Sequence, residues 1–265
     1  MPHAIGIDIG SLNTKAVLLG PGGILASAVL PTGDETEATA RQALERLAEE
    51  TGFRPGEDAC IVATGIGGRA ITFARQSKAI TTCLARGTAF LFPSARMVVD
   101  IGAESCTVVK LNSRGRVVDW AGHDKCAAGT GIFLQQMARL LQIPITGLSA
   151  LSLAATGRAD ITSTCAVFAE SDVISHVHRD PPTPREDIAA GIYHSVVSRI
   201  AALCKRIGIE KDVAAAGGVA QSQGLVKMLS EELGCTVLVP PQPPVVAALG
   251  AAVLAREHLE RGAGR

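Results

Sequence analysis

One pattern occurs twice in this chain and constrains its fold more than any other feature. Residues 5–19 (IGIDIGSLNTKAVLL) and 97–111 (MVVDIGAESCTVVKL) each hold an apolar run with an aspartate inside it, then a glycine, then a second apolar run. Each copy predicts a strand, a tight turn at the glycine and a second strand, with Asp8 and Asp100 at matching places. The repetition therefore predicts a duplicated α/β unit.

The first copy carries groups that suit phosphate. After Gly10, which permits the turn, residues 11–15 (SLNTK) supply hydroxyls, an amide, backbone donors and a cation. A carboxylate such as Asp8 can hydrogen-bond to the water on a hydrated magnesium ion. The alternative to a phosphate site is an ordinary polar hairpin tip with one unfavourably buried aspartate. Two such hairpins, facing one another across a cleft, would hold a nucleotide's phosphates and metal from both sides, so the repetition favours a nucleotide site.

The rest of the chain alternates between helical and strand patterns. Apolar spacing predicts helices over residues 37–51, 80–92, 131–141, 146–155, 184–206 and 245–260, with buried strands that end at Gly65 and Gly217. Gly217 and Gly218 let the backbone approach a nucleobase and ribose, or they simply join a strand closely to a helix. The glycine-rich turn at residues 65–69 either contacts a ligand or merely turns the chain. We expect a first lobe of residues 1–95, with the helix 245–265 packed back on it, and a second lobe of residues 96–244.

Two cysteines lie where helices are expected to begin. Cys126 occupies a turn of small residues (KCAAGTG), and Cys165 follows Ser163 and Thr164, which we expect to cap the next helix. The positive end of a helix dipole stabilises a thiolate or another anion. Two cysteines in such places favour a pair of ligands over two inert thiols.

The turn after Cys126 has a further expected property. Gly129, Thr130 and Gly131 form a plausible N-cap region whose backbone amides would be free to face a negative group. The chain has seven cysteines and no CxxC pair, which argues against both a disulfide framework and a local zinc knuckle. Cys60 and Cys83 lie on apolar faces and are predicted to be core residues.

Charge and aromatic content limit the kinds of partner that we expect the chain to bind. The 25 basic and 25 acidic residues cancel, and the chain has one Trp and one Tyr, so a nucleic-acid surface is not expected. No apolar run reaches membrane-spanning length, and the first residues enter a strand pattern at once. We expect a soluble, cytoplasmic protein without a signal peptide or a membrane anchor.

The two Asp-x-Gly hairpins followed by a GGV turn resemble the ATPase fold of actin, Hsp70 and sugar kinases. Within that fold, the motifs KCAAGTG, STCAVFAES and GGVAQ together resemble the ATPase family that activates 2-hydroxyacyl-CoA dehydratases and includes the ATP-binding subunits of benzoyl-CoA reductase. The resemblance covers essentially the whole chain. It implies an α/β architecture of duplicated ribonuclease H-like lobes around a nucleotide cleft.

The resemblance also implies cofactors. In that family a homodimer, or a heterodimer with a paralogue, holds one [4Fe-4S] cluster, and each subunit gives two cysteines. Carried over by motif, these are Cys126 and Cys165, and a two-fold axis supplies the four thiolates that a cubane needs. With the residue patterns above, the predicted catalytic residues are Asp8, Asp100 and Glu104. The predicted ATP contacts, with Mg²⁺, are Gly10, Ser11, Asn13, Thr14, Lys15, Gly102, Ala103, Gly129, Thr130, Gly217, Gly218, Gln221 and Gln242.

The implied function is ATP-driven delivery of a low-potential electron. A ferredoxin or flavodoxin would be the donor, and an iron–sulfur acyl-CoA dehydratase or a benzoyl-CoA reductase would be the acceptor. Two departures from the dehydratase activators leave the partner open: the second hairpin reads DIGAES where they usually read DIGGQD, and Cys83 lacks its usual flanking Glu and His. The Ala-Glu form is more like the benzoyl-CoA reductase subunits. A small-molecule kinase of the same fold and a nucleotide-dependent regulatory switch are the alternatives.

Overall fold

The computed structural model describes residues 3–54, 59–123 and 130–263. Its contacts divide the chain into two compact units. Unit 1 comprises Met1–Val98, Val109–Val118 and Pro240–Arg265, and unit 2 comprises Val99–Val108 and Asp119–Val239. The lobe boundaries at residues 95 and 244 stay a prediction.

The first sheet is built from strands β1 (His3–Ile9), β2 (Asn13–Gly20), β3 (Gly23–Pro31), β4 (Ala59–Gly65) and β5 (Gln76–Ser77). Their order is β3-β2-β1-β4-β5, with β1 antiparallel to β2 and parallel to β4. The predicted strand–turn–strand of residues 5–19 is therefore confirmed. The outer strand β3 was not predicted.

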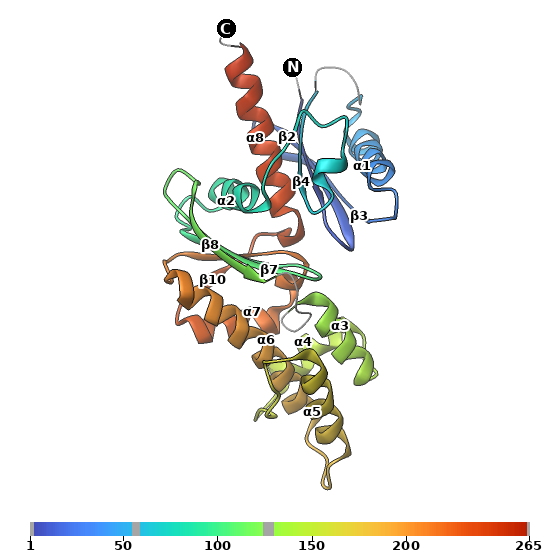
Figure 1. The fold of residues 1–265 in the computed structure, drawn as a ribbon, viewed down its shortest axis with the longest axis vertical. Helices are drawn as coiled ribbons and strands as arrows, with labels where there is room; N and C mark the ends of the chain where they lie inside the picture. Colours follow the sequence, from blue (N-terminus) through green and yellow to red (C-terminus); the bar gives the residue numbers. More distant parts are fainter. Residues whose placement is uncertain (1–2, 55–58, 124–129, 264–265) are drawn as a thin grey trace. The chain divides into compact units, whose positions relative to one another are not determined.

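Helices cover both faces of this sheet (Figure 1). Because side chains alternate along a strand, Ile5, Ile7 and Ile9 face one side, where they pack with α1 (Thr36–Thr51). The opposite face packs against α8 (Val246–Ala263), which also contacts α2 (Ile80–Leu91). A Cβ atom on Gly6 would overlap the Ala248 carbonyl, so this glycine lets α8 lie directly on the sheet.

The second sheet repeats the first. Its strands are β6 (Met97–Ile101), β7 (Cys106–Leu111), β8 (Val117–His123), β9 (Val213–Ala216) and β10 (Val237–Leu238). Their order is β10-β9-β6-β7-β8, which places the first strand of the set between the second and the fourth, as in the first sheet. The predicted duplication and the α/β fold class are confirmed.

Unit 2 adds the helices α3 (Gly131–Leu140), α4 (Ile145–Ala154), α5 (Ala166–His178), α6 (Arg185–Ile207) and α7 (Gln223–Leu233). The central helix is α6, which contacts α4, α5 and α7. Its stripe of Ile188, Ile192, Val196 and Ile200 is fully buried. The predicted helices are confirmed to within a few residues at their ends. Three short 3₁₀ helices complete the described chain: η1 (Gly68–Ala70), η2 (Gly218–Gln221) and η3 (Pro243–Val245).

One predicted cap is wrong. The N-cap residue of α5 is Cys165 itself, with extended backbone angles, and not Ser163 or Thr164. The reason is that the backbone around 163 and 164 is held by tertiary contacts instead of turning into the helix, as described below. No single described helix is long and apolar enough to cross a membrane, although α3 and α4, bent by 79° at their junction, pass that test as a pair by length and composition.

Candidate functional site

The first hairpin holds a buried ion pair. Asp8, near the end of β1, is 5% exposed, and its Oδ2 accepts a hydrogen bond from Lys15 Nζ at 3.0 Å. The Gly10 N–H closes the turn by donating to the Asn13 carbonyl at 3.0 Å. A Cβ atom at Gly10 would lie 2.8 Å from Lys15 Nζ, so the glycine leaves space for the cation. A buried carboxylate needs such a partner, and the hairpin supplies it from its own second strand.

A second glycine forms the wall beside Asp8. Gly65 ends β4, has a φ of +83°, and is paired with Ile9 across the parallel ladder. A Cβ atom there would overlap both Asp8 Oδ1 and the Ile9 carbonyl. Gly67 N–H then donates to the Ile9 carbonyl at 3.3 Å. The turn 65–69 therefore packs on the end of β1. A ligand contact from it stays a prediction.

The second hairpin, in unit 2, has the same construction. Gly102 N–H donates to the Ser105 carbonyl at 2.9 Å. Gly217 follows β9 as Gly65 ends β4, and its φ is +86°. A Cβ atom on Gly217 would overlap the Ile101 carbonyl and lie 2.8 Å from Asp100 Oδ1. Each unit therefore presents an aspartate at a strand end, a tight hairpin, and a left-handed glycine against the carboxylate.

The copies differ in charge. In the aligned sequences, Thr107 occupies the place of Lys15. Glu104 of the second hairpin is exposed, where the first copy has Leu12. The duplication is therefore one of backbone geometry, while Lys15 and Glu104 each correspond to an uncharged residue, Thr107 and Leu12, at the matching place of the other copy.

Two glutamines that are predicted to contact ATP, Gln221 and Gln242, each form a hydrogen bond to another residue of their own unit. Gln221 Nε2 donates to the Gly218 carbonyl at 3.2 Å, and Gln242 Oε1 accepts from Ser27 Oγ at 2.6 Å. Gly218 differs from Gly217, since a Cβ atom on it would meet nothing within 4 Å. The open space at Gly218 is compatible with a ligand. The ATP contacts of these residues stay predictions.

The prediction that the backbone amides at the start of α3 are free is wrong for Gly131. Its N–H donates to the Gly102 carbonyl at 2.9 Å, and the N–H of Ile132 donates to the Ala103 carbonyl at 2.9 Å. Helix starts leave backbone donors without internal partners, and here the second hairpin satisfies two of them. Thr130, the N-cap residue, is fully buried. Cys126 and Gly129 lie outside the described residues.

Cys165 is half-buried at the N-cap of α5. Arg199, on α6, donates from one nitrogen, Nη1, to the carbonyls of Ser163 at 2.5 Å and Thr164 at 2.9 Å. Sequence reasoning missed Arg199, because no motif marks it and its partners are far away along the chain. Within the described ranges, no group of three His, Cys, Asp or Glu side chains converges to hold a metal ion. The thiol of Cys165 fits one position of a shared thiolate site and does not complete a site alone.

The deeply buried cysteines are poor ligands. Burial raises the pKa of Cys83 and of Cys204 to about 12, and it also raises the pKa of Cys106. Because the thiolate is the ligand and nucleophile, these groups stay inert at neutral pH. Cys60 is also buried, so the prediction that Cys60 and Cys83 belong to the core is confirmed.

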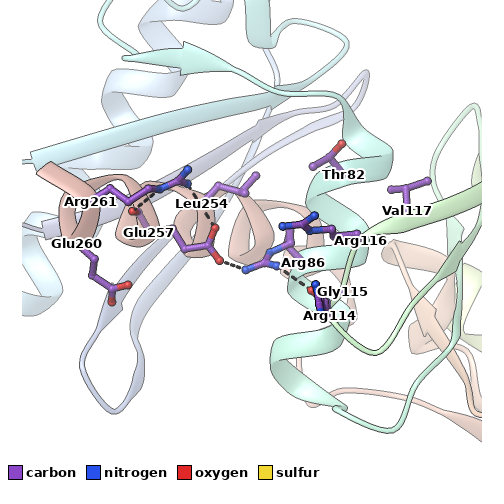
Figure 2. A pocket seen from close by; sticks show the side chains of 10 residues that line it. All are labelled: Thr82, Arg86, Arg114, Gly115, Arg116, Val117, Leu254, Glu257, Glu260 and Arg261. Atoms are coloured by element: carbon purple, nitrogen blue, oxygen red, sulfur yellow. Dashed lines mark hydrogen bonds and ion pairs between the residues drawn. The ribbon is translucent and has the colours of Figure 1, made fainter.

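A separate hollow in unit 1 contains none of the predicted site residues. It is lined by side chains of α2, α8 and the turn between β7 and β8, namely Thr82, Arg86, Arg114, Gly115, Arg116, Val117, Leu254, Glu257, Glu260 and Arg261. Figure 2 shows Arg86 paired with Glu257 and directed at the Arg114 carbonyl, to which its Nη1 donates at 2.9 Å. This contact fastens the β7–β8 turn to α2 and α8.

The repeated sheet order and the two Asp-x-Gly hairpins define a duplicated α/β fold of the actin, Hsp70 and sugar-kinase type. A glucokinase of the ROK family from Streptomyces griseus shares this fold with a TM-score of 0.57 at 13% identity, covering 96% of this chain and 99% of its own. The pattern of the BadF/BadG/BcrA/BcrD ATPase family matches residues 5–255. The chain belongs to this family.

Relatives with known names span the whole chain. A 2-hydroxyisocaproyl-CoA dehydratase activator of Clostridioides difficile is 39% identical over 254 residues, which are 96% of this chain and 94% of the relative. A solved activator of that dehydratase from Clostridium difficile, with bound ADPNP, has a TM-score of 0.92 at 37% identity, covering 99% and 97% of the two chains. A benzoyl-CoA reductase subunit of Thauera aromatica is 34% identical over 264 residues, with 96% and 93% covered. The predicted family resemblance is confirmed.

Proposed function

We propose that this chain is an ATP-hydrolysing iron–sulfur activator that delivers a low-potential electron to an acyl-CoA dehydratase or reductase. The observation that carries the proposal is the combination of an ATPase-family fold with a half-buried cysteine at the start of a helix. The similar proteins support the partner class, since they are named as dehydratase activators and as a reductase subunit. The higher identity to the activators, 39% against 34%, favours a 2-hydroxyacyl-CoA dehydratase as the partner.

For hydrolysis, we assign the two hairpins to the phosphates and Mg²⁺ of ATP. Lys15 forms an ion pair with Asp8. In the proposed complex, its ammonium group would also bind phosphate oxygens of ATP. Asp8 and Asp100 would order magnesium-bound water, and the exposed Glu104 would orient the attacking water. Phosphoryl transfer to water requires mainly positioning and neutralisation of charge, which a lysine and a bound metal ion provide.

For electron transfer, we assign Cys126 and Cys165 to a [4Fe-4S] cluster that two subunits share. A cubane takes four thiolates and each chain gives two, so a second copy or a paralogue completes the site. The bound cluster would supply one-electron chemistry at low potential. Val167 and Phe168, next to Cys165 on α5, are 67% and 64% exposed. Adjacent exposed apolar side chains suit a surface that a second copy of the chain covers.

Coupling between hydrolysis and the cysteine region has a physical connection in unit 2. The hairpin that carries Asp100 is hydrogen-bonded to the first turn of α3 through Gly131 and Ile132. A shift of that hairpin on loss of the terminal phosphate would therefore move the start of α3, which follows the Cys126 motif. We propose this connection as the route by which hydrolysis changes the surroundings of the cluster.

The test is anaerobic purification followed by separate assays of iron and ATPase activity. Asp8→Asn and Asp100→Asn should abolish ATP hydrolysis and keep the iron, whereas Cys165→Ser should lose the iron. Addition of a dehydratase or reductase with a reduced ferredoxin should then show ATP-dependent transfer by the wild type. Iron-free wild type that phosphorylates an added small-molecule acceptor would instead identify a kinase. Nucleotide binding without turnover would identify a regulatory switch.

A further inference from the structure

Arg199 lies on α6, behind the turn that leads to Cys165. Its Nη1 donates to the carbonyls of both residues that precede the cysteine, Ser163 at 2.5 Å and Thr164 at 2.9 Å. One guanidinium group therefore binds two successive carbonyls, and these hydrogen bonds fix the orientation of both peptide groups. A charge-assisted hydrogen bond of this kind is stronger than a bond between neutral groups.

Further hydrogen bonds fix the same turn. The N–H of Thr162 donates to Asp172 Oδ2 of α5 at 2.9 Å, and the N–H of Thr164 donates to Thr162 Oγ1 at 3.3 Å. The Cys165 carbonyl accepts from the Ala169 N–H at 3.0 Å in the first turn of the helix. The backbone on both sides of the Cys165 side chain is thus held, although the side chain itself is half-buried.

The helix backbone that carries Arg199 lies in the core of unit 2. The next residue, Ile200, and Val196, one turn earlier, are fully buried in unit 2. The Nε atom of Arg199 is also buried and has no hydrogen-bond partner among the described residues. A buried donor without a partner is costly, and the two bonds from Nη1 to the turn offset part of that cost.

We propose that Arg199 is the positioning residue for Cys165: it holds residues 163–165 in the conformation that presents the thiol, and it sets a positive charge against the carbonyl that directly precedes the cysteine. This inference rests on the proposed iron–sulfur function and adds a residue to it. A thiolate ligand that is held in place before binding loses less freedom when the cluster binds. A nearby positive charge also favours the reduced, more negative state of a cluster and raises its midpoint potential.

The test compares Arg199→Gln and Arg199→Lys with Arg185→Gln. Arg185 is a matched control, since it also lies on α6 and donates to a backbone carbonyl, that of Leu141, away from the Cys165 turn. In the protein without cluster, amide hydrogen exchange over residues 162–169 should be about tenfold faster in Arg199→Gln and unchanged in Arg185→Gln. After reconstitution, Arg199→Gln should bind iron more weakly and have a more negative midpoint potential, and Arg199→Lys should restore part of both.

The outcomes separate this inference from the proposed function. Unchanged exchange over residues 162–169 and unchanged iron binding in Arg199→Gln would overturn the positioning role. A lower unfolding temperature shared equally with Arg185→Gln, without a local change, would likewise overturn it in favour of a general structural role. Wild type that binds no iron overturns the proposed function, and the exchange data then decide separately whether Arg199 fixes the turn.

Discussion

The backbone N–H of Gly131 donates to the carbonyl oxygen of Gly102 at 2.9 Å. This hydrogen bond ties the first turn of α3 to the hairpin that carries Asp100, two predicted functional regions that lie apart in the sequence. The parallel bond from Ile132 to the Ala103 carbonyl makes the connection a pair. Two bonds in succession resist rotation of the hairpin against the helix better than one.

Gly131→Ala should weaken this connection. A Cβ atom at 131 would lie 3.2 Å from both the Gly102 carbonyl oxygen and Val219 Cγ2, so the hairpin and the helix must separate slightly. We expect a change of at most about 1 kcal/mol in the free energy of unfolding, because the higher helix propensity of alanine at the start of α3 offsets the tight contact. ATP hydrolysis should continue, with fewer electrons transferred per ATP. Wild-type electron yield in this variant would argue against coupling through the Gly102–Gly131 bond.

Gly217→Ala and Gly218→Ala should have different effects: the first on stability, the second on nucleotide affinity. At Gly217 a Cβ atom would overlap the Ile101 carbonyl and the φ of +86° disfavours alanine, so urea denaturation should show a destabilised protein. At Gly218 there is open space, and stability should stay within about 0.5 kcal/mol of wild type. If nucleotide occupies that space, Gly218→Ala should nevertheless bind ATP more weakly in calorimetry. Wild-type affinity would remove Gly218 from the site.

Lys15→Met should destabilise the fold as well as stop hydrolysis. It leaves Asp8, 5% exposed, without its 3.0 Å partner, and breaking a buried pair in this way costs about 3–5 kcal/mol. Lys205→Met is the matched control, because the Lys205–Glu232 pair has the same 3.0 Å separation but lies at the surface, where such a pair contributes up to about 1 kcal/mol. Equal losses in the two variants would contradict a buried pair at Asp8.

The buried thiols predict a loss of stability at high pH. Cys83 and Cys204 have a pKa of about 12 in the folded chain, against 9.0 for an ordinary thiol, because burial disfavours the thiolate. Since the unfolded chain releases these protons first, stability is fully present below pH 9 and falls as the pH rises from about 9 to 12. A Cys83→Ala/Cys204→Ala variant should show a shallower decline in denaturant titrations over that range. An unchanged decline of stability with pH in this variant would show that groups other than Cys83 and Cys204 cause it.

Local patterns in the sequence were enough to predict much of the fold. The Asp-Gly hairpins were predicted correctly because alternation, a turn glycine and a buried aspartate are all signals within 15 residues. The outer strand β3 was not predicted, since Leu25 and Val29 are about half exposed and the strand lacks a clean apolar face. The outer strand β8 of the second sheet has the same property at Val118 and Trp120.

The candidate site was predictable only where its chemistry is local. The free amide expected at Gly131 is bonded to Gly102, whose position relative to α3 depends on tertiary packing. Arg199 reaches Ser163 across 36 residues of sequence, and no spacing rule marks such a pair. Motifs therefore indicated which residues matter, whereas the contacts that orient them required the structure.

The central claim is most directly tested by iron analysis of anaerobically reconstituted protein. The account predicts about four irons for every two chains, with a spectrum that dithionite bleaches. Cys165→Ser should lose this iron, while Cys235→Ser, which removes another half-buried thiol, should keep it. Iron-free wild type, or Cys165→Ser with a full complement of iron, would contradict the account.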